Sequence, residues 1–209
     1  DALEGCGLGA DDLAAHAAFG ARLRSYRFDR YRTKEKAEDK PGIKKLQVLA
    51  PDLTGARKVF ADLDRIADGV MFTRDLVSEP ANVLYPAAFA ERVKDLADLG
   101  VEIEVLGEKE MKKLGMGALL GVGQGSTRES QLVVMKWMGS ADRKAAPVAL
   151  VGKGVCFDSG GISLKPAASM EDMKWDMGGA GVVAGAMKAI AGRKAKVNAI
   201  GILGLVENM

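Results

Sequence analysis

The sequence predicts an α/β protein with a largely parallel central sheet flanked by helices. Beyond residue 80, apolar segments of strand length alternate with segments whose apolar residues have helical spacing, which is the pattern that builds such layers. A long amphipathic segment, residues 55–77, precedes them and separates them from a shorter first part. We therefore expect two parts joined by a helix, with ligands gathered at the carboxyl ends of the strands in the second part.

The first part is expected to hold one helix and one strand. Asp11 or Asp12 is the expected N-cap of a helix that extends to residue 25. After a turn at Pro41 and Gly42, residues 43–50 have the apolar content of a strand. The joining helix carries apolar residues at helical spacing, namely Val59, Leu63, Ile66, Val70 and Val77.

The second part alternates helices and strands. Pro86 suits the first turn of a helix, and Gly100 suits the position just past its end. In chain order we expect a helix over 86–99, a strand over 101–106, a helix over 108–114, strands over 132–138 and 147–151, a glycine-rich helix over about 172–191 and a strand over 197–206. The expected domains are 1–54, the end of an N-terminal α/β domain, 55–79, a linker helix, and 80–209, the second domain.

The glycine-rich segment 151–161 carries the most informative chemistry. Lys153 and Asp158 lie in it, and Lys165 and Asp176 follow. An amine binds a cation only when deprotonated, which for lysine near neutral pH requires burial or a neighbouring positive charge. A bound divalent ion supplies that charge. The flanking glycines are expected to let the backbone bend and carry Lys153 inward, where it could share an ion with Asp158. Both residues are expected just past the end of a strand. Lys165 would face the anionic species formed at the ion.

The order and spacing of these residues resemble the leucyl aminopeptidase (cytosol aminopeptidase) family of two-metal enzymes. The upstream segment 73–82 resembles the family's entry into its catalytic domain, so the resemblance covers roughly residues 20 to 209. The matching motifs are Gly152-Lys153-Gly154, Phe157-Asp158-Ser159-Gly160-Gly161, Lys165-Pro166 and Met173 with Asp176-Met177-Gly178-Gly179-Ala180.

Roles follow from the resemblance residue by residue. It implies that Lys153 and Asp176 bind one metal ion, that Asp158 bridges both ions, and that Lys165 is catalytic and contacts the substrate carbonyl oxygen. Met173 would line the pocket for the first side chain of the substrate. The implied cofactors are two divalent ions, Zn or Mn with Mg and Co as further candidates, and a bicarbonate in the complete site.

The resemblance also implies an activity. A cytoplasmic, homohexameric hydrolase would remove N-terminal, leucine-like residues from peptides with a free N-terminus, through a water activated by two metal ions. The family's remaining ligands lie in an Asn-Thr-Asp-Ala-Glu-Gly-Arg motif that would follow residue 209. We therefore expect a chain truncated at both ends that carries about half of an active site and is inactive as an isolated fragment.

The composition of the chain suggests few alternative functions. A net charge of +2 gives no general attraction to nucleic acid or membranes, and no apolar run approaches the roughly 18 residues of a spanning helix. Two cysteines, Cys6 and Cys156, do not suggest a disulfide framework, so a cytoplasmic location is expected. Ser159 is not expected to be a nucleophile, because the only histidine, His16, is far away in the sequence.

The alternative function is a nucleic-acid-binding module that uses the basic cluster 22–36. Interleaved aromatic residues could stack on bases, while Glu35, Glu38 and Asp39 dilute the positive charge. A solvated face or a subunit contact is favoured over this alternative, although some members of the family bind DNA as a second role. The basic residues are Arg22, Arg24, Arg27, Arg30, Arg32, Lys34 and Lys36, and the aromatic ones are Tyr26, Phe28 and Tyr31.

Overall fold

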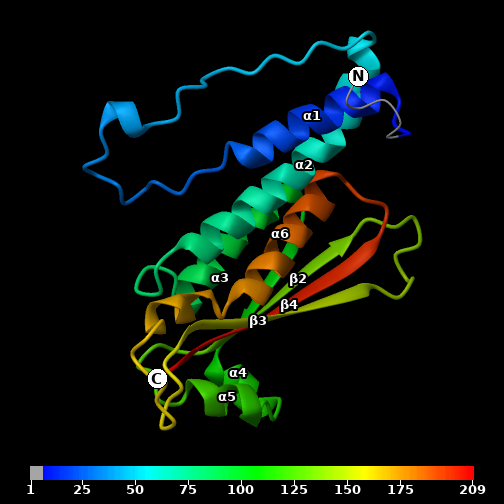
Figure 1. Cartoon of the computed structure of the whole chain (residues 1–209). Helices are drawn as coiled ribbons and strands as arrows, with labels where there is room; N and C mark the ends of the chain where they lie inside the picture. The colour runs from blue at the N-terminus through cyan, green and yellow to red at the C-terminus, as the bar shows by residue number, and fades with distance from the viewer. Residues whose placement is uncertain (1–6) are drawn as a thin grey trace. The chain divides into compact units, whose positions relative to one another are not determined.

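The computed structural model describes residues 7–209, so Cys6 lies outside the described residues. The chain forms two compact units, Asp1–Ala67 and Asp68–Met209, and the division falls within the long helix α2 (Leu53–Ser78). The amphipathic helix expected over 55–77 is therefore confirmed (Figure 1).

The first unit is mainly helical. It holds α1 (Ala10–Arg24), a short 3-10 helix, η1 (Ala37–Asp39), and the beginning of α2. Gly9 is the N-cap of α1, so the expected cap at Asp11 or Asp12 is wrong. Both carboxylates lie in the first turn, where they interact favourably with the positive end of the helix dipole.

The strand expected over residues 43–50 is also wrong. Within the described part of the chain these residues pair with no strand, and the side chains of Ile43 and Leu49 are 82% and 86% exposed. Apolar content favours a strand only when a neighbouring strand satisfies its backbone hydrogen bonds.

The second unit is built on a four-stranded mixed sheet. The strands are β1 (Glu102–Leu106), β2 (Gln131–Met138), β3 (Val148–Asp158) and β4 (Asn198–Asn208), in the order β1-β2-β4-β3. The α/β class with flanking helices is confirmed. The expectation of a largely parallel sheet is wrong, because β1 pairs with β2 and β2 pairs with β4 in antiparallel fashion, and only β3 and β4 are parallel.

The connections explain these strand directions. A parallel pair requires a long crossover, which α6 (Gly178–Gly192) supplies between β3 and β4. Residues 139–147 reverse the chain between β2 and β3 without such a crossover. Strand spacing along the sequence did not reveal which strands become neighbours.

The remaining helices follow the sequence pattern closely. The expected helix over 86–99 is an α-helix, α3 (Pro86–Lys94), continued by the 3-10 helix η2 (Asp95–Leu99). Gly100 lies just past its end, as expected, with a φ of 87°. The expected short helix is α4 (Glu108–Lys113), and η3 (Met170–Trp175) precedes α6. Helix α5 (Gly117–Gly123) was not expected, because its glycine content is typical of a loop.

Helices cover both faces of the sheet, as Figure 1 shows for α6 on one side and α4 and α5 on the other. Two glycines of β4 mark these faces. A Cβ on Gly201 would meet Val183 and Met187 of α6, whereas a Cβ on Gly204 would meet Leu119 of α5. The main core lies on the α6 face, where buried residues of α3, α6 and the strands pack together.

Candidate active site

Strand β3 carries the first two predicted site residues. Lys153 pairs with Gly204 inside the strand, and Asp158 is its last residue, opposite Asn208 after a register shift. The strand is longer than the expected 147–151, so the prediction that both residues lie just past a strand end is wrong. Both still lie in the carboxyl-terminal half of β3.

The glycines around Lys153 serve close packing rather than a bend. The backbone remains extended, and a Cβ on Gly152 would lie 2.6 Å from the Cα of Ala180 in α6. A Cβ on Gly154 would lie 2.5 Å from a methyl group of Leu205. The missing side chains let the start of α6 approach β3, while the side chain of Lys153 is 63% exposed instead of pointing inward.

Close approach of α6 brings Asp176 to Lys153. Asp176 lies between η3 and α6, and its Oδ1 is 2.8 Å from Nζ of Lys153. A second ion pair joins Nζ of Lys165 to Oδ2 of Asp158 at 2.7 Å. Each predicted lysine is thus paired with one of the predicted carboxylates.

The two carboxylates are themselves neighbours. Partial burial raises the pKa of Asp158, but hydrogen bonds from Lys165 and from the Gly160 amide, together with Asp176, outweigh it and hold that pKa below its ordinary value. Asp158 is therefore ionised near neutral pH, in the form that binds cations.

Met173 completes the cluster. Nζ of Lys165 lies 3.1 Å from Sδ of Met173 and 3.2 Å from the main-chain oxygen of Asp158. The structure thus brings all five predicted residues together, although they come from β3, the loop after it, and the segment around η3. Their individual roles stay predictions.

The cluster fits a divalent cation. Oδ2 of Asp176 is buried and has no hydrogen-bond partner, which is costly for a carboxylate oxygen unless a cation satisfies it. An amine nitrogen and carboxylate oxygens are suitable donors for divalent ions such as Zn²⁺ and Mn²⁺. Among residues 7–209 no group of three or more His, Cys, Asp and Glu side chains could hold a metal ion, so this donor set depends on Lys153.

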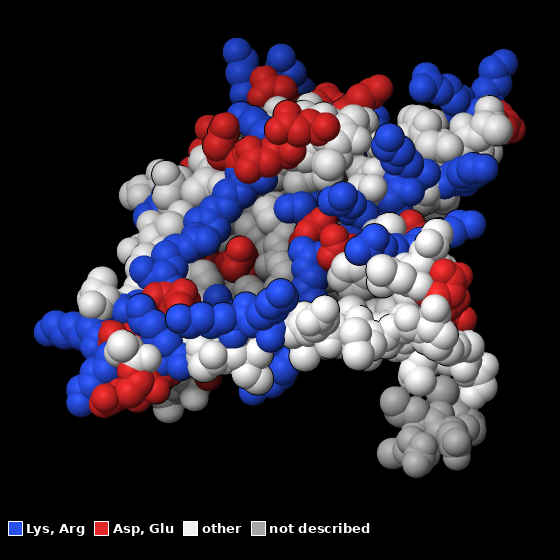
Figure 2. Space-filling model, turned by 90° about the horizontal axis from the view of Figure 1, so that it is seen from above, with Lys and Arg blue, Asp and Glu red and all other residues white. Residues whose placement is uncertain are grey.

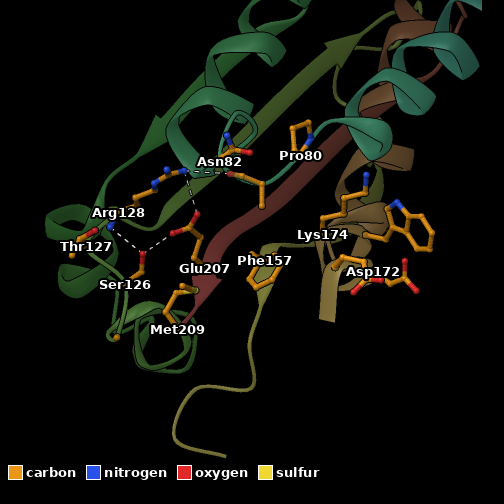
Figure 3. Close-up of a pocket in the computed structure, with 14 residues that line it drawn as sticks. Pro80, Asn82, Ser126, Thr127, Arg128, Phe157, Asp172, Lys174, Glu207 and Met209 are labelled. Carbon is orange, nitrogen blue, oxygen red and sulfur yellow. Dashed lines mark hydrogen bonds and ion pairs between the residues drawn. The ribbon is translucent and has the colours of Figure 1, made fainter. Parts of the chain in front are cut away.

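A separate cavity of about 850 Å³ lies in the same unit (Figure 3). On its wall the buried carboxylate of Glu207 accepts a hydrogen bond from Ser126 at 2.7 Å and from Arg128 at 3.4 Å. The guanidinium group of Arg128 also lies 4.1 Å from the ring centroid of Tyr85. The sequence pattern does not predict this network, and none of the five predicted site residues lines the cavity.

Several basic residues of the cluster 22–36 form ion pairs with acidic residues of the first unit. Arg22 forms an ion pair with Asp64, Arg27 pairs with Glu35, and Lys36 lies 3.6 Å from Glu38. Figure 2 shows acidic side chains among the basic ones on the face that it presents. This pairing does not favour the nucleic-acid-binding alternative.

An α/β unit that gathers lysine and aspartate donors in one cluster defines a candidate metal-dependent enzyme. The chain belongs to the cytosol aminopeptidase family: residues 71–209, well over half of the chain, match that family's catalytic domain. The resemblance seen in the sequence is confirmed.

Curated relatives agree over nearly the whole chain. The probable cytosol aminopeptidase of Caulobacter vibrioides is 67% identical over 203 residues, which are 97% of this chain and 41% of that protein. The probable cytosol aminopeptidase of Brucella melitensis is 60% identical over 202 residues, 96% of this chain and 41% of that protein. The chain therefore spans about two fifths of the length of these relatives.

Solved structures share the fold. The bottromycin maturation enzyme BotP in complex with Mn matches with a TM-score of 0.84 and 36% identity, covering 99% of this chain and 42% of that one. The cytosol aminopeptidase from Coxiella burnetii matches with a TM-score of 0.76 and 29% identity, covering 95% of this chain and 40% of that one.

No helix within residues 7–209 combines the length and the apolar content that a membrane span requires.

Proposed function

We propose that the protein containing this chain is a metal-dependent aminopeptidase that removes leucine-like residues from the N-termini of peptides. Membership of the cytosol aminopeptidase family supports this activity. The observation that carries the proposal is the cluster in which the buried, unpartnered Oδ2 of Asp176 lies beside Asp158 and Lys153. This chain would supply about half of the active site.

Three side chains would hold the metal. Lys153 and Asp176 would bind one divalent ion, and Asp158 would bridge it to a second. When bound, such ions polarise the scissile carbonyl group and lower the pKa of a water molecule so that it can attack. The protein's task is to hold the two carboxylates close together, with Asp158 ionised.

Lys165 and Met173 would act on the substrate. The ammonium group of Lys165 is held by Asp158 and would donate a hydrogen bond to the peptide carbonyl oxygen as that oxygen becomes negative. Met173 lies against the same ammonium group, and its flexible, apolar thioether would line the pocket for the N-terminal side chain.

The finer features are part of the same proposal. The ions would be Zn or Mn, with Mg or Co as substitutes, and a bicarbonate would join the complete site; the Mn in the BotP complex supports a divalent ion. The enzyme would be a cytoplasmic homohexamer acting on peptides with a free N-terminus. Residues 1–54 would end an N-terminal domain, 55–79 would be the linker helix, and 80–209 would begin the catalytic domain.

Metal removal tests the activity. The whole protein, stripped with a chelator, should lose hydrolysis of a leucyl amide and regain it with Mn²⁺ or Zn²⁺. Full activity in a preparation whose metal content is confirmed as negligible would contradict the proposal.

A further inference from the structure

The hydroxyl group of Ser159 connects the turn after β3 to the end of β4. It donates a hydrogen bond to the main-chain oxygen of Asn208 at 2.9 Å, and the main-chain N–H of Ser159 donates to the same oxygen at 2.9 Å. The hydroxyl oxygen also accepts the N–H of Gly161 at 3.3 Å. Loss of the side chain would remove both hydroxyl bonds and leave the backbone bond.

The turn needs such a restraint. Gly160 and Gly161 have φ angles of 92° and 65°, in the left-handed region that glycine adopts freely. Two consecutive glycines give this segment more conformational freedom than any other residue pair would. The bonds of Ser159 to Asn208 and Gly161 select one conformation from that freedom.

The conformation of this turn determines where two site residues lie. The N–H of Gly160 donates to Oδ1 of Asp158 at 2.9 Å, and the N–H of Lys165 donates to the main-chain oxygen of Ser159 at 2.9 Å. Ser159 therefore lies between the carboxylate that would bridge the metal ions and the amine that would contact the substrate.

We propose that Ser159 is a positioning residue: its hydroxyl fixes the turn to β4 and thereby orients Asp158 for metal binding and Lys165 for the substrate. The inference rests on the proposed function of the cluster. A nucleophilic role does not fit, because the hydroxyl donates to a main-chain oxygen and the chain's single histidine, His16, is hydrogen bonded to the main-chain oxygen of Asp12.

The test compares variants of the whole protein by three measurements: calorimetric titration of the metal-stripped form with Mn²⁺, steady-state kinetics of the Mn²⁺-loaded form, and thermal unfolding of the metal-free form. Ser159→Ala should bind Mn²⁺ about tenfold to a hundredfold more weakly, the usual effect of losing a group that orients a metal ligand. Its kcat should also fall, while the melting temperature of the metal-free form stays within a few degrees. Ser159→Thr, which keeps the hydroxyl, and Ser163→Ala, at an exposed serine of the same loop, should both behave as the unmodified protein.

The inference would be overturned if Ser159→Ala had the Mn²⁺ affinity and kcat of the unmodified protein. It would also be overturned if Ser159→Thr folded but were as impaired as Ser159→Ala. If Ser159→Ala does not fold, Ser159→Cys takes its place, since a thiol has a similar shape and forms only weak hydrogen bonds. An unmodified protein that neither binds Mn²⁺ nor hydrolyses leucyl amides would instead refute the proposed function itself.

Discussion

The ammonium group of Lys165 lies 2.7 Å from Oδ2 of Asp158, although six residues, which include a glycine turn, separate them in the sequence. The pair places a cation that would contact substrate directly beside a carboxylate that would bind metal. Lys153 forms the corresponding pair with Asp176. Each lysine thus forms an ion pair with one of the two carboxylates, although different roles are proposed for them. Substitution of each lysine in turn tests these roles.

The first prediction separates these lysines. Lys165→Ala in the whole protein should keep its metal but lower kcat by roughly a hundredfold to a thousandfold, the usual effect of deleting one donor to a developing oxyanion. Lys153→Ala should instead weaken the binding of one ion. Elemental analysis beside steady-state kinetics distinguishes them, and loss of metal from the Lys165 variant alone would mean that the roles are exchanged.

A second prediction concerns the contact between α2 and α6. A Cβ on Gly185 would overlap the hydroxyl of Thr73 and the main-chain oxygen of Gly69. Gly185→Ala should therefore lower the free energy of unfolding by about 1–3 kcal/mol, as overpacking does. Gly121→Ala in α5 is the matched control, because a Cβ there meets open space and alanine favours a helix.

Chemical denaturation of both variants measures this difference. The control should be as stable as the unmodified protein or slightly more so. Equal stability of Gly185→Ala and Gly121→Ala would show that the two helices separate easily and that their backbones need not approach so closely.

A third prediction concerns Cys156, whose side chain is buried at 1% exposure. Burial raises the pKa of this thiol most, and the negative charge of Glu207 raises it further. The thiol therefore stays protonated and unreactive at neutral and mildly alkaline pH. Peptide mapping after iodoacetamide treatment should find Cys156 unmodified in the folded protein and fully modified after denaturation. Rapid alkylation of the native protein at pH 8 would contradict the described burial.

The sequence predicted which residues lie close together better than it predicted the sheet. The motif spacing identified five residues that the structure brings together, because a family signature preserves residues that meet in the fold. Strand direction in the sheet was wrong, since it depends on which strands become neighbours. The full length of β3 was missed because Gly152 and Gly154 weaken a strand pattern, although their lack of side chains is what admits α6.

Two contacts between segments distant in the sequence could not be predicted. The bonds of Ser159 to Asn208 depend on the register of β3 against β4, which sequence alone does not determine. Likewise, the ion pair between the buried Glu207 and the partly exposed Arg128 joins side chains that share no local motif. Such contacts arise only when the strands take their final neighbours.

The most direct measurement is the metal content of the whole protein and of its Asp176→Asn variant after reconstitution with Mn²⁺. Because Oδ2 of Asp176 is buried and unpartnered, the variant, shown to be folded by circular dichroism, should hold at least one ion fewer per chain. Asp172→Asn, on the adjacent η3, is the control and should keep the full complement. Equal Mn²⁺ content in the unmodified protein and the Asp176 variant would show that this cluster does not bind metal through Asp176.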